Sequence, residues 1–143
     1  MIRIVLDTNV VASGLLWGGS PWKLMQVVRE TGIPIYTSLP LVAELMAILS
    51  RSKFTSKLHS SGDSVEGIVN SYLMVVELVN PVDAAGQAPD PDDDVVIGTA
   101  LAAKADLLVT GDKALLGVRA FKGGRIVSVA EALRSIETPE SLG

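Results

Sequence analysis

Acidic residues stand at four separate places in this sequence, each where a parallel α/β fold would bring a side chain to one edge of its sheet. They are Asp7 after an apolar run, Glu44 inside a helical pattern, a triplet at residues 92–94, and Asp112 after a second apolar run. Carboxylates that gather repel one another, and a bound cation relieves the repulsion. Because carboxylate oxygens suit hard divalent ions such as Mg²⁺ and Mn²⁺, the pattern predicts a metal site of the kind that serves phosphoryl chemistry.

Asp7 and Asp112 carry the strongest geometric argument. Each follows a short aliphatic run, at residues 2–6 and 107–109, with the length and composition of a buried strand. In open parallel sheets, ligands bind beyond the carboxyl ends of the strands. A single aspartate after a strand is usually only a turn former or helix cap, but two of them, together with the other acids, favour a shared site.

Glu44 lies within an apolar helical stretch, where its spacing places it on the same side as Leu41 and Ile48. A carboxylate near a core face is unfavourable unless it is paired or bound to a metal. A functional role for Glu44 is therefore favoured over an exposed position on the helix.

The triplet Asp92-Asp93-Asp94 opens a second apolar helix, where one acid can cap the helix, one can face solvent and one can point to a metal. Asp93 precedes Ile97 by four residues and Ala100 by seven, so it should share their inward face. Asp94 has nearly the same relation to these two positions. Spacing alone leaves both Asp93 and Asp94 as candidate metal ligands.

Hydroxyl and amide side chains flank the acids, at Thr8, Asn9 and Thr110. Such groups hold metal-bound waters or orient carboxylates around metal sites, and they are equally common as turn formers. The sequence has no cysteine, and its single histidine, His59, has no evident partner, so thiolate chemistry and histidine-based triads are disfavoured.

Alternating strand and helix patterns supply the framework for these residues. They predict an α/β fold, a three-layer α/β/α sandwich with a central, mostly parallel sheet of four or five strands. Strands are expected at residues 2–6, 33–36, 76–79, 107–109 and 125–127. Helices are expected at residues 10–16, 20–30 with Ser20 as N-cap, 38–49 with Ser38 as N-cap, 65–75, 92–103, 113–116 and 130–136.

Composition supports one domain with a single core, because 143 residues with 48% hydrophobic and only 4% aromatic content suit aliphatic strands covered by helices. No signal peptide or membrane-length apolar run is evident, so a cytoplasmic location is expected.

The net charge of −4 argues against a general nucleic-acid binder, though less so if the acids are concentrated in a metal site. A modest basic stretch could bind the phosphate backbone of a nucleic acid, although such stretches are more often solvated helix ends. It consists of Arg51, Lys53, Lys57 and His59.

Four motifs, in this order and spacing, resemble the PIN domain family. They are Leu6-Asp7-Thr8-Asn9, the helical Glu44, the segment at residues 90–94, and Ala105-Asp106-Leu107-Leu108-Val109-Thr110-Gly111-Asp112. The match extends over residues 2 to about 129. The Asp-Pro-Asp-Asp segment and the Leu115-Leu116 pair resemble most the prokaryotic branch that forms the toxin components of toxin–antitoxin pairs.

The resemblance implies a single PIN-like nuclease domain over residues 1–143, with its core at about 2–129. It implies an endoribonuclease that cleaves RNA with Mg²⁺ or Mn²⁺ and a metal-activated water, through Asp7, Glu44, Asp93 or Asp94, and Asp112. A small antitoxin partner and a homodimer are also expected. Many relatives have an acid two residues after the aspartate of the Thr-Gly-Asp motif, and here that position is Ala114.

Two other functional classes compete with this interpretation. A receiver-like phosphoacceptor domain also gathers acids at strand ends, but it needs an acid pair after the first strand, where this chain has Asp7-Thr8-Asn9. The same segment disfavours a haloacid-type phosphatase. A non-catalytic PIN-fold interaction module is the second class, and Ala114 leaves room for it.

Overall fold

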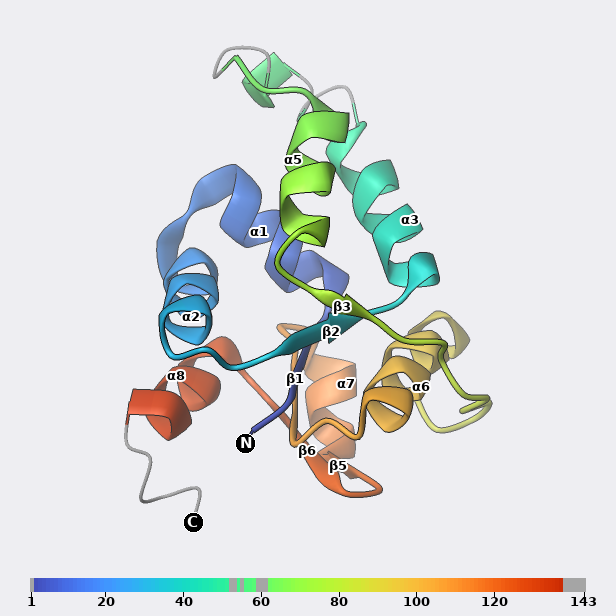
Figure 1. Ribbon diagram of the computed structural model, residues 1–143. Coiled ribbons are helices and arrows are strands. Elements are labelled where there is room, and N and C mark those ends of the chain that lie inside the picture. Colours follow the sequence, from blue (N-terminus) through green and yellow to red (C-terminus); the bar gives the residue numbers. More distant parts are fainter. Residues whose placement is uncertain (1, 52–53, 55, 59–61, 138–143) are drawn as a thin grey trace.

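The short aliphatic runs of the sequence form the middle of a six-stranded sheet in the computed structural model (Figure 1). The structure describes residues 2–51, 54, 56–58 and 62–137. The strand order is β3-β2-β1-β4-β6-β5, and every neighbouring pair is parallel except β5 with β6. The strands are β1 (Ile4–Leu6), β2 (Ile35–Thr37), β3 (Glu77–Leu78), β4 (Leu107–Val109), β5 (Ala120–Phe121) and β6 (Gly124–Val127).

The predicted α/β architecture with a mostly parallel sheet is confirmed, and the sheet has one strand more than the expected maximum of five. The additional strand is β5, which forms an antiparallel hairpin with β6 at the sheet edge. β5 (Ala120–Phe121) lies outside any aliphatic run, unlike the equally short β3, whose surrounding residues 76–79 include three aliphatic side chains.

Helices cover both faces of the sheet. In Figure 1, α1, α2, α3 and α5 lie above the sheet, and α6 and α7 lie below it. Their bounds are α1 (Thr8–Trp17), α2 (Gly19–Glu30), α3 (Leu39–Leu49), α5 (Val65–Leu73), η1 (Pro91–Asp93), α6 (Asp94–Ala103), α7 (Lys113–Val118) and α8 (Val129–Glu137).

Two helix starts differ from the expectation. Ser20 is not the N-cap of α2, because Gly18 and Gly19, both at positive φ, allow the chain to turn out of α1 and begin α2 earlier. Ser38 does occupy the N-cap position of α3, but its side chain makes no capping hydrogen bond.

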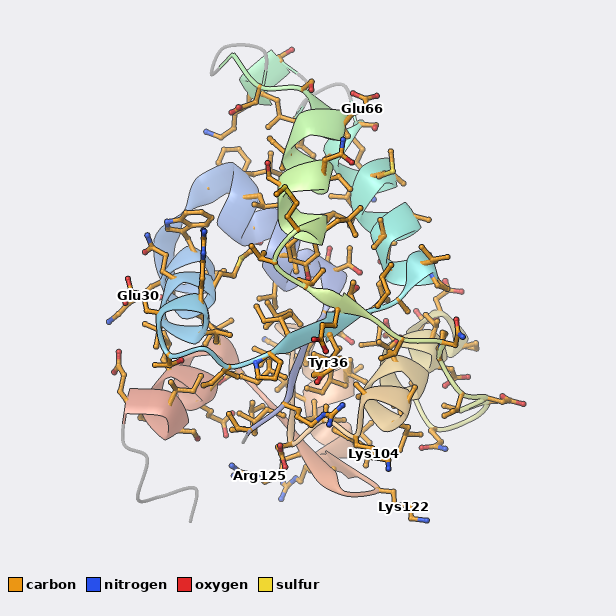
Figure 2. The ribbon with its side chains drawn as sticks, in the orientation of Figure 1. Glu30, Tyr36, Glu66, Lys104, Lys122 and Arg125 are labelled. Atoms are coloured by element: carbon orange, nitrogen blue, oxygen red, sulfur yellow. The ribbon has the colours of Figure 1, made fainter. Side chains whose placement is uncertain are left out.

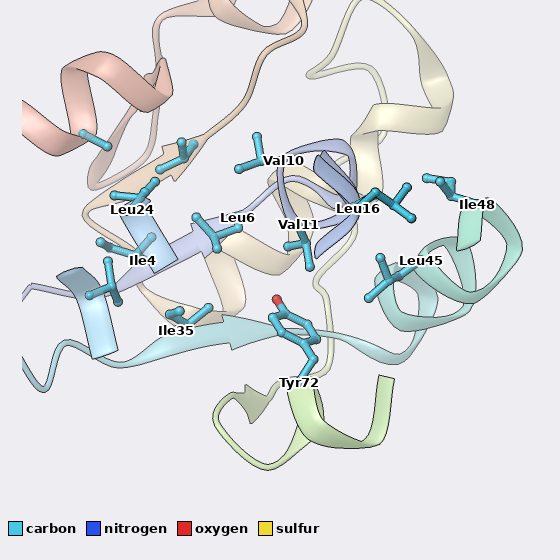
Figure 3. Packing of buried hydrophobic residues seen from close by; sticks show 14 of the residues in the cluster. Ile4, Leu6, Val10, Val11, Leu16, Leu24, Ile35, Leu45, Ile48 and Tyr72 are labelled. Atoms are coloured by element: carbon cyan, nitrogen blue, oxygen red, sulfur yellow. The ribbon is translucent and has the colours of Figure 1, made fainter. Parts of the chain in front are cut away.

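The core has two parts, one on each face of the sheet. Ile4 and Leu6 of β1 pack into the cluster formed with α1, α2, α3, α5 and α8, while Val5 between them packs into the cluster on the α6 face. Figure 3 shows the first cluster, in which Ile4, Leu6, Leu24 and Ile35 lie together. This alternation follows from the period of two along a strand, and it fixes the register of β1 against its neighbours.

One glycine determines how closely the loop before the acidic triplet approaches α6. Gly98 accepts a hydrogen bond from the Val82 amide at 3.1 Å, and a Cβ atom on Gly98 would overlap the Val82 carbonyl oxygen. Only glycine therefore permits the loop to lie against this side of the helix. Among the described residues, no helix is long and apolar enough to cross a membrane.

Candidate active site

Asp7 lies at the carboxyl end of β1, where the parallel pairing of Leu6 with Val109 sets it beside β4. Its backbone amide donates to the Val109 carbonyl at 2.8 Å, and its side chain is only 4% exposed. The carboxylate makes no capping hydrogen bond to α1, although Asp7 holds the N-cap position. Helix capping therefore does not account for a buried acid at this position.

Thr110 connects Asp7 with Asp112. The fully buried Thr110 hydroxyl donates to Asp7 Oδ2 at 2.7 Å and accepts from the Asp112 amide at 3.1 Å. Asp112 Oδ2 in turn accepts from the Leu115 amide at 3.1 Å, so Asp112 caps α7 with one oxygen. Its other oxygen has no role in the cap.

Glu44 lies between the core and solvent. Leu41 and Ile48 are buried as the spacing predicted, but Glu44 is exposed. Its carboxylate turns back toward the start of α1, where the Thr8 hydroxyl donates to Oε2 over a long 3.4 Å. The pKa of Glu44 is raised, first by partial desolvation and then by the charge of Asp7. Glu44 was expected to point inward from α3. Only its carboxylate does so, through the contact with Thr8.

The acidic triplet divides between two tasks. Asp94 accepts the Gly86 amide on Oδ2 at 3.0 Å and the Ala88 amide on Oδ1 at 2.8 Å. Both of its oxygens therefore hold the loop that precedes the triplet. Asp92 is exposed, and its amide donates to the side chain of Asp90, which caps η1.

Asp93 is the member of the triplet that interacts with the other acids. Its pKa is raised to about 6, first by burial and then by the negative charges of Asp7, Asp112, Asp90 and Glu44. Burial also raises the pKa of Asp7, partly offset by the Thr110 hydroxyl and the Thr8 backbone. The shifts show that Asp7, Glu44 and Asp93 repel one another across a shared space.

The donor set suits a hard divalent cation, because it consists of carboxylate oxygens whose repulsion a cation relieves. Within the described ranges, no three acidic side chains are already arranged as a metal-binding group. Binding would therefore require rotations that turn the carboxylates of Asp7, Asp93, Asp112 and Glu44 toward a common point. The chemistry of the residues fits the ion, and the metal site itself stays a prediction.

Two buried hydroxyls form a contact that the sequence did not predict. Ser38 Oγ lies 2.8 Å from Thr99 Oγ1, and the Thr99 hydroxyl also donates to the Val95 carbonyl at 2.7 Å. Both side chains are fully buried. The contact joins the start of α3, which carries Glu44, to the helix that begins after Asp93. The two residues are 61 positions apart, and nothing in the sequence links them.

The remaining expected residues lie at several places in the fold. Asn9 and Ala114 are exposed at the first turns of α1 and α7. Arg51 is close enough to Glu44 to lower its pKa slightly, and the Lys57 ammonium lies 4.5 Å from the Trp17 ring centre. Lys53 and His59 of the predicted basic stretch lie outside the described residues.

Comparison with known families agrees with this geometry. The family model described as PIN domain matches residues 3–114, which is well over half of the chain, and the chain therefore belongs to the PIN domain family. The predicted resemblance is confirmed. Membership of this family leaves a non-catalytic PIN module as the main alternative to a nuclease.

Two solved structures share the fold. VapBC2 from Rickettsia felis bound to a DNA fragment from their promoter aligns with a TM-score of 0.60 at 14% identity, over 89% of this chain and 98% of that chain. FitAcB from Neisseria gonorrhoeae aligns with a TM-score of 0.56 at 16% identity, with the same two coverages. No curated protein matches this sequence. Identities this low show a common fold.

The division between Asp93 and Asp94 predicts opposite effects on stability. Asp94→Asn should lower the free energy of unfolding by about 1–3 kcal/mol, because an amide presents one acceptor where two backbone N–H groups need partners. Asp93→Asn should leave stability at pH 7 unchanged or raise it, since it removes a charge from a group of repelling acids. Urea denaturation in metal-free buffer measures both, and equal losses in the two variants would contradict the assignment.

The raised pKa of Asp93 predicts a pH dependence of stability with a definite sign. Between the ordinary value of 3.8 and about 6, the folded state binds this proton and the unfolded state does not. The metal-free protein should therefore lose stability as pH rises through this window. The loss should be smaller in Asp93→Asn, and added Mn²⁺ should raise the melting temperature more at pH 7.5 than at pH 5. A thermal shift by Mn²⁺ that is the same at both values would count against metal binding at this centre.

Proposed function

We propose that this protein is a metal-dependent endoribonuclease whose acidic centre comprises Asp7, Glu44, Asp93 and Asp112. The observation that carries the proposal is that acids from four distant segments meet at the carboxyl edge of a parallel sheet, where burial and neighbouring carboxylates raise the pKa values of Asp7, Glu44 and Asp93. RNA is proposed as the substrate because of the resemblance to the toxin-component branch of the PIN family. Mg²⁺ or Mn²⁺ is proposed as the cofactor.

In this proposal the chain itself provides position and charge. Asp7 accepts a hydrogen bond from Thr110, and Asp112 accepts one from the Leu115 amide, so each carboxylate is anchored at the end of its strand. When bound, the divalent ion supplies a Lewis acid and an activated water for in-line attack on the phosphodiester. Thr8 and Thr110 orient the carboxylates of Glu44 and Asp7. No side chain is needed as a nucleophile.

The proposal includes a role as the toxin of a toxin–antitoxin pair in the cytoplasm. An apolar groove of about 840 Å³ suits an amphipathic segment of a small antitoxin, and it lies away from the acidic centre, between α2, the start of β2 and the end of α5. Its lining includes Trp22, Met25, Ile33 and Met74, and Met74 is 86% exposed.

A homodimer is proposed through α3. Leu39 is 67% exposed and Met46 is 38% exposed on this helix, and large apolar side chains on one helix commonly mark a protein contact. Leu39 and Met46 are seven residues apart on α3, so they share one face of the helix.

Replacement of single acids tests the nuclease proposal. Asp7→Asn and Asp112→Asn should each reduce Mg²⁺- or Mn²⁺-dependent cleavage of a single-stranded RNA by about 100-fold or more, because each removes a carboxylate from the ion. Asp63→Asn, at an exposed acid far from the centre, is the matched control and should retain activity. Full activity of Asp7→Asn would defeat the assignment. A folded wild-type protein that cleaves no RNA would instead support the interaction module.

Light scattering tests the dimer. The wild-type chain should show about twice its monomer mass of 15.0 kDa, and the double variant Leu39→Glu, Met46→Glu should be a monomer, since buried like charges oppose association. Met74→Glu, an equally polar change in the groove, should leave the dimer intact. A monomeric wild type would contradict the dimer while leaving the nuclease proposal untouched.

A further inference from the structure

The hairpin at the edge of the sheet concentrates positive charge. Residues 119–125 contain three of the 12 lysines and arginines and no acid, in a chain with a net charge of −4. Together with one residue after α6 they form what we call the basic edge, whose members are all exposed: Lys104, Arg119, Lys122 and Arg125.

The fold, rather than the sequence, brings Lys104 to the hairpin. β6 runs parallel to β4 with Arg125 opposite Leu107, and the Arg125 amide donates to the Asp106 carbonyl at 3.0 Å. Gly124 lies so close to the Ala105 carbonyl that a side chain there would overlap it. Figure 2 shows Lys104, Lys122 and Arg125 at the same end of the molecule, around the turn between β5 and β6.

Two acids lie next to the basic edge, and neither cancels it. The carboxylate of Asp106 accepts the Arg3 amide at 2.8 Å. Glu131 binds the Ser128 amide, and Arg125 is among the weaker causes of its lowered pKa. Four cations against two acids leave a local positive field at this edge.

Helix α7 connects the basic edge to the acidic centre. It begins at Lys113, directly after Asp112, and Arg119 follows its last residue. Six helical residues span about 9 Å, so a strand that leaves the acidic centre along α7 reaches the basic edge within a few nucleotides. Lys113 is exposed at the start of this path.

The described part of the basic edge has no large exposed hydrophobic side chain, and this favours a nucleic acid over a protein as its partner. Large exposed hydrophobic side chains in the described residues belong to other elements, and none lies between residues 104 and 125. Protein interfaces have an apolar centre, whereas the phosphate backbone of a nucleic acid is bound by cations alone.

We propose that the basic edge binds the phosphate backbone of the RNA strand on one side of the cleavage point, without selecting bases. This inference rests on the proposed nuclease function and adds to it a second contact surface, opposite the acidic edge of the sheet. It explains how a chain with net negative charge holds a polyanion: the acids and the cations are separated to the two ends of the strands.

Charge reversal at the hairpin tests the inference apart from cleavage. In the Asp7→Asn background, without metal, Lys122→Glu with Arg125→Glu should weaken binding of a 20-nucleotide single-stranded RNA by about 10-fold or more at low salt. The slope of log K against log salt should fall by about 1.4, which corresponds to two lost phosphate contacts. Fluorescence anisotropy over a salt series gives both quantities.

The matched control is Lys23→Glu with Arg134→Glu, which changes the net charge equally on α2 and α8. It removes the exposed ion pair of Lys23 with Glu137 and the weak attraction of Arg134 to Glu131, and such exposed pairs contribute little to stability. Equal binding by the control and the hairpin variant would overturn the inference. The neutral pair Lys122→Ala, Arg125→Ala should show about half the effect in log K and serves if charge reversal disturbs folding. If the wild type cleaves no RNA while the hairpin variant still loses binding, the nuclease proposal fails and the basic edge stands as an RNA-binding surface.

Discussion

Electrostatic repulsion among carboxylates is the constraint around which this structure is arranged. The pairing of β1 with β4 forces Asp7 into a buried position beside the segment that carries Asp112. Burial and neighbouring charge both raise the pKa of Asp93, and the donor that Thr110 supplies to Asp7 is a neutral hydroxyl. A fold optimised only for stability would avoid this cluster, because unpaired buried charge is unfavourable. Retention of the cluster is what an ion-dependent site requires.

The surroundings of the cluster stabilise it without neutralising it. Asp94 uses both oxygens to hold the loop at residues 86–88, and Gly98 lets the earlier part of that loop lie against α6. The buried contact between Ser38 and Thr99 ties α3 to α6. These contacts fix the helices that carry Glu44 and Asp93, so the repelling groups stay near one another while remaining free to rotate toward an ion.

Separation of charge gives the molecule two chemically different ends. The acids gather at the carboxyl ends of β1 and β4, and the cations of the basic edge lie at the opposite ends of β4 and β6. The net charge of −4 is a sum over the whole chain, so it does not reveal that one end is acidic and the other basic. The proposed nuclease uses the first end for chemistry and the second for holding the substrate strand.

The sequence by itself determined the layered α/β fold, the acids at the strand ends and the family, because strand length, helix period and the motifs around Asp7 and Asp112 are local properties of the chain. It also predicted that Leu41 and Ile48 are buried, but not that Glu44 is exposed. Tertiary structure alone separated Asp93 from Asp94, which have nearly the same helical spacing. The difference arises from the amides of Gly86 and Ala88, which a loop of separate origin brings to Asp94. The same holds for the short strand β5, which lies outside any aliphatic run and pairs with the free edge of β6.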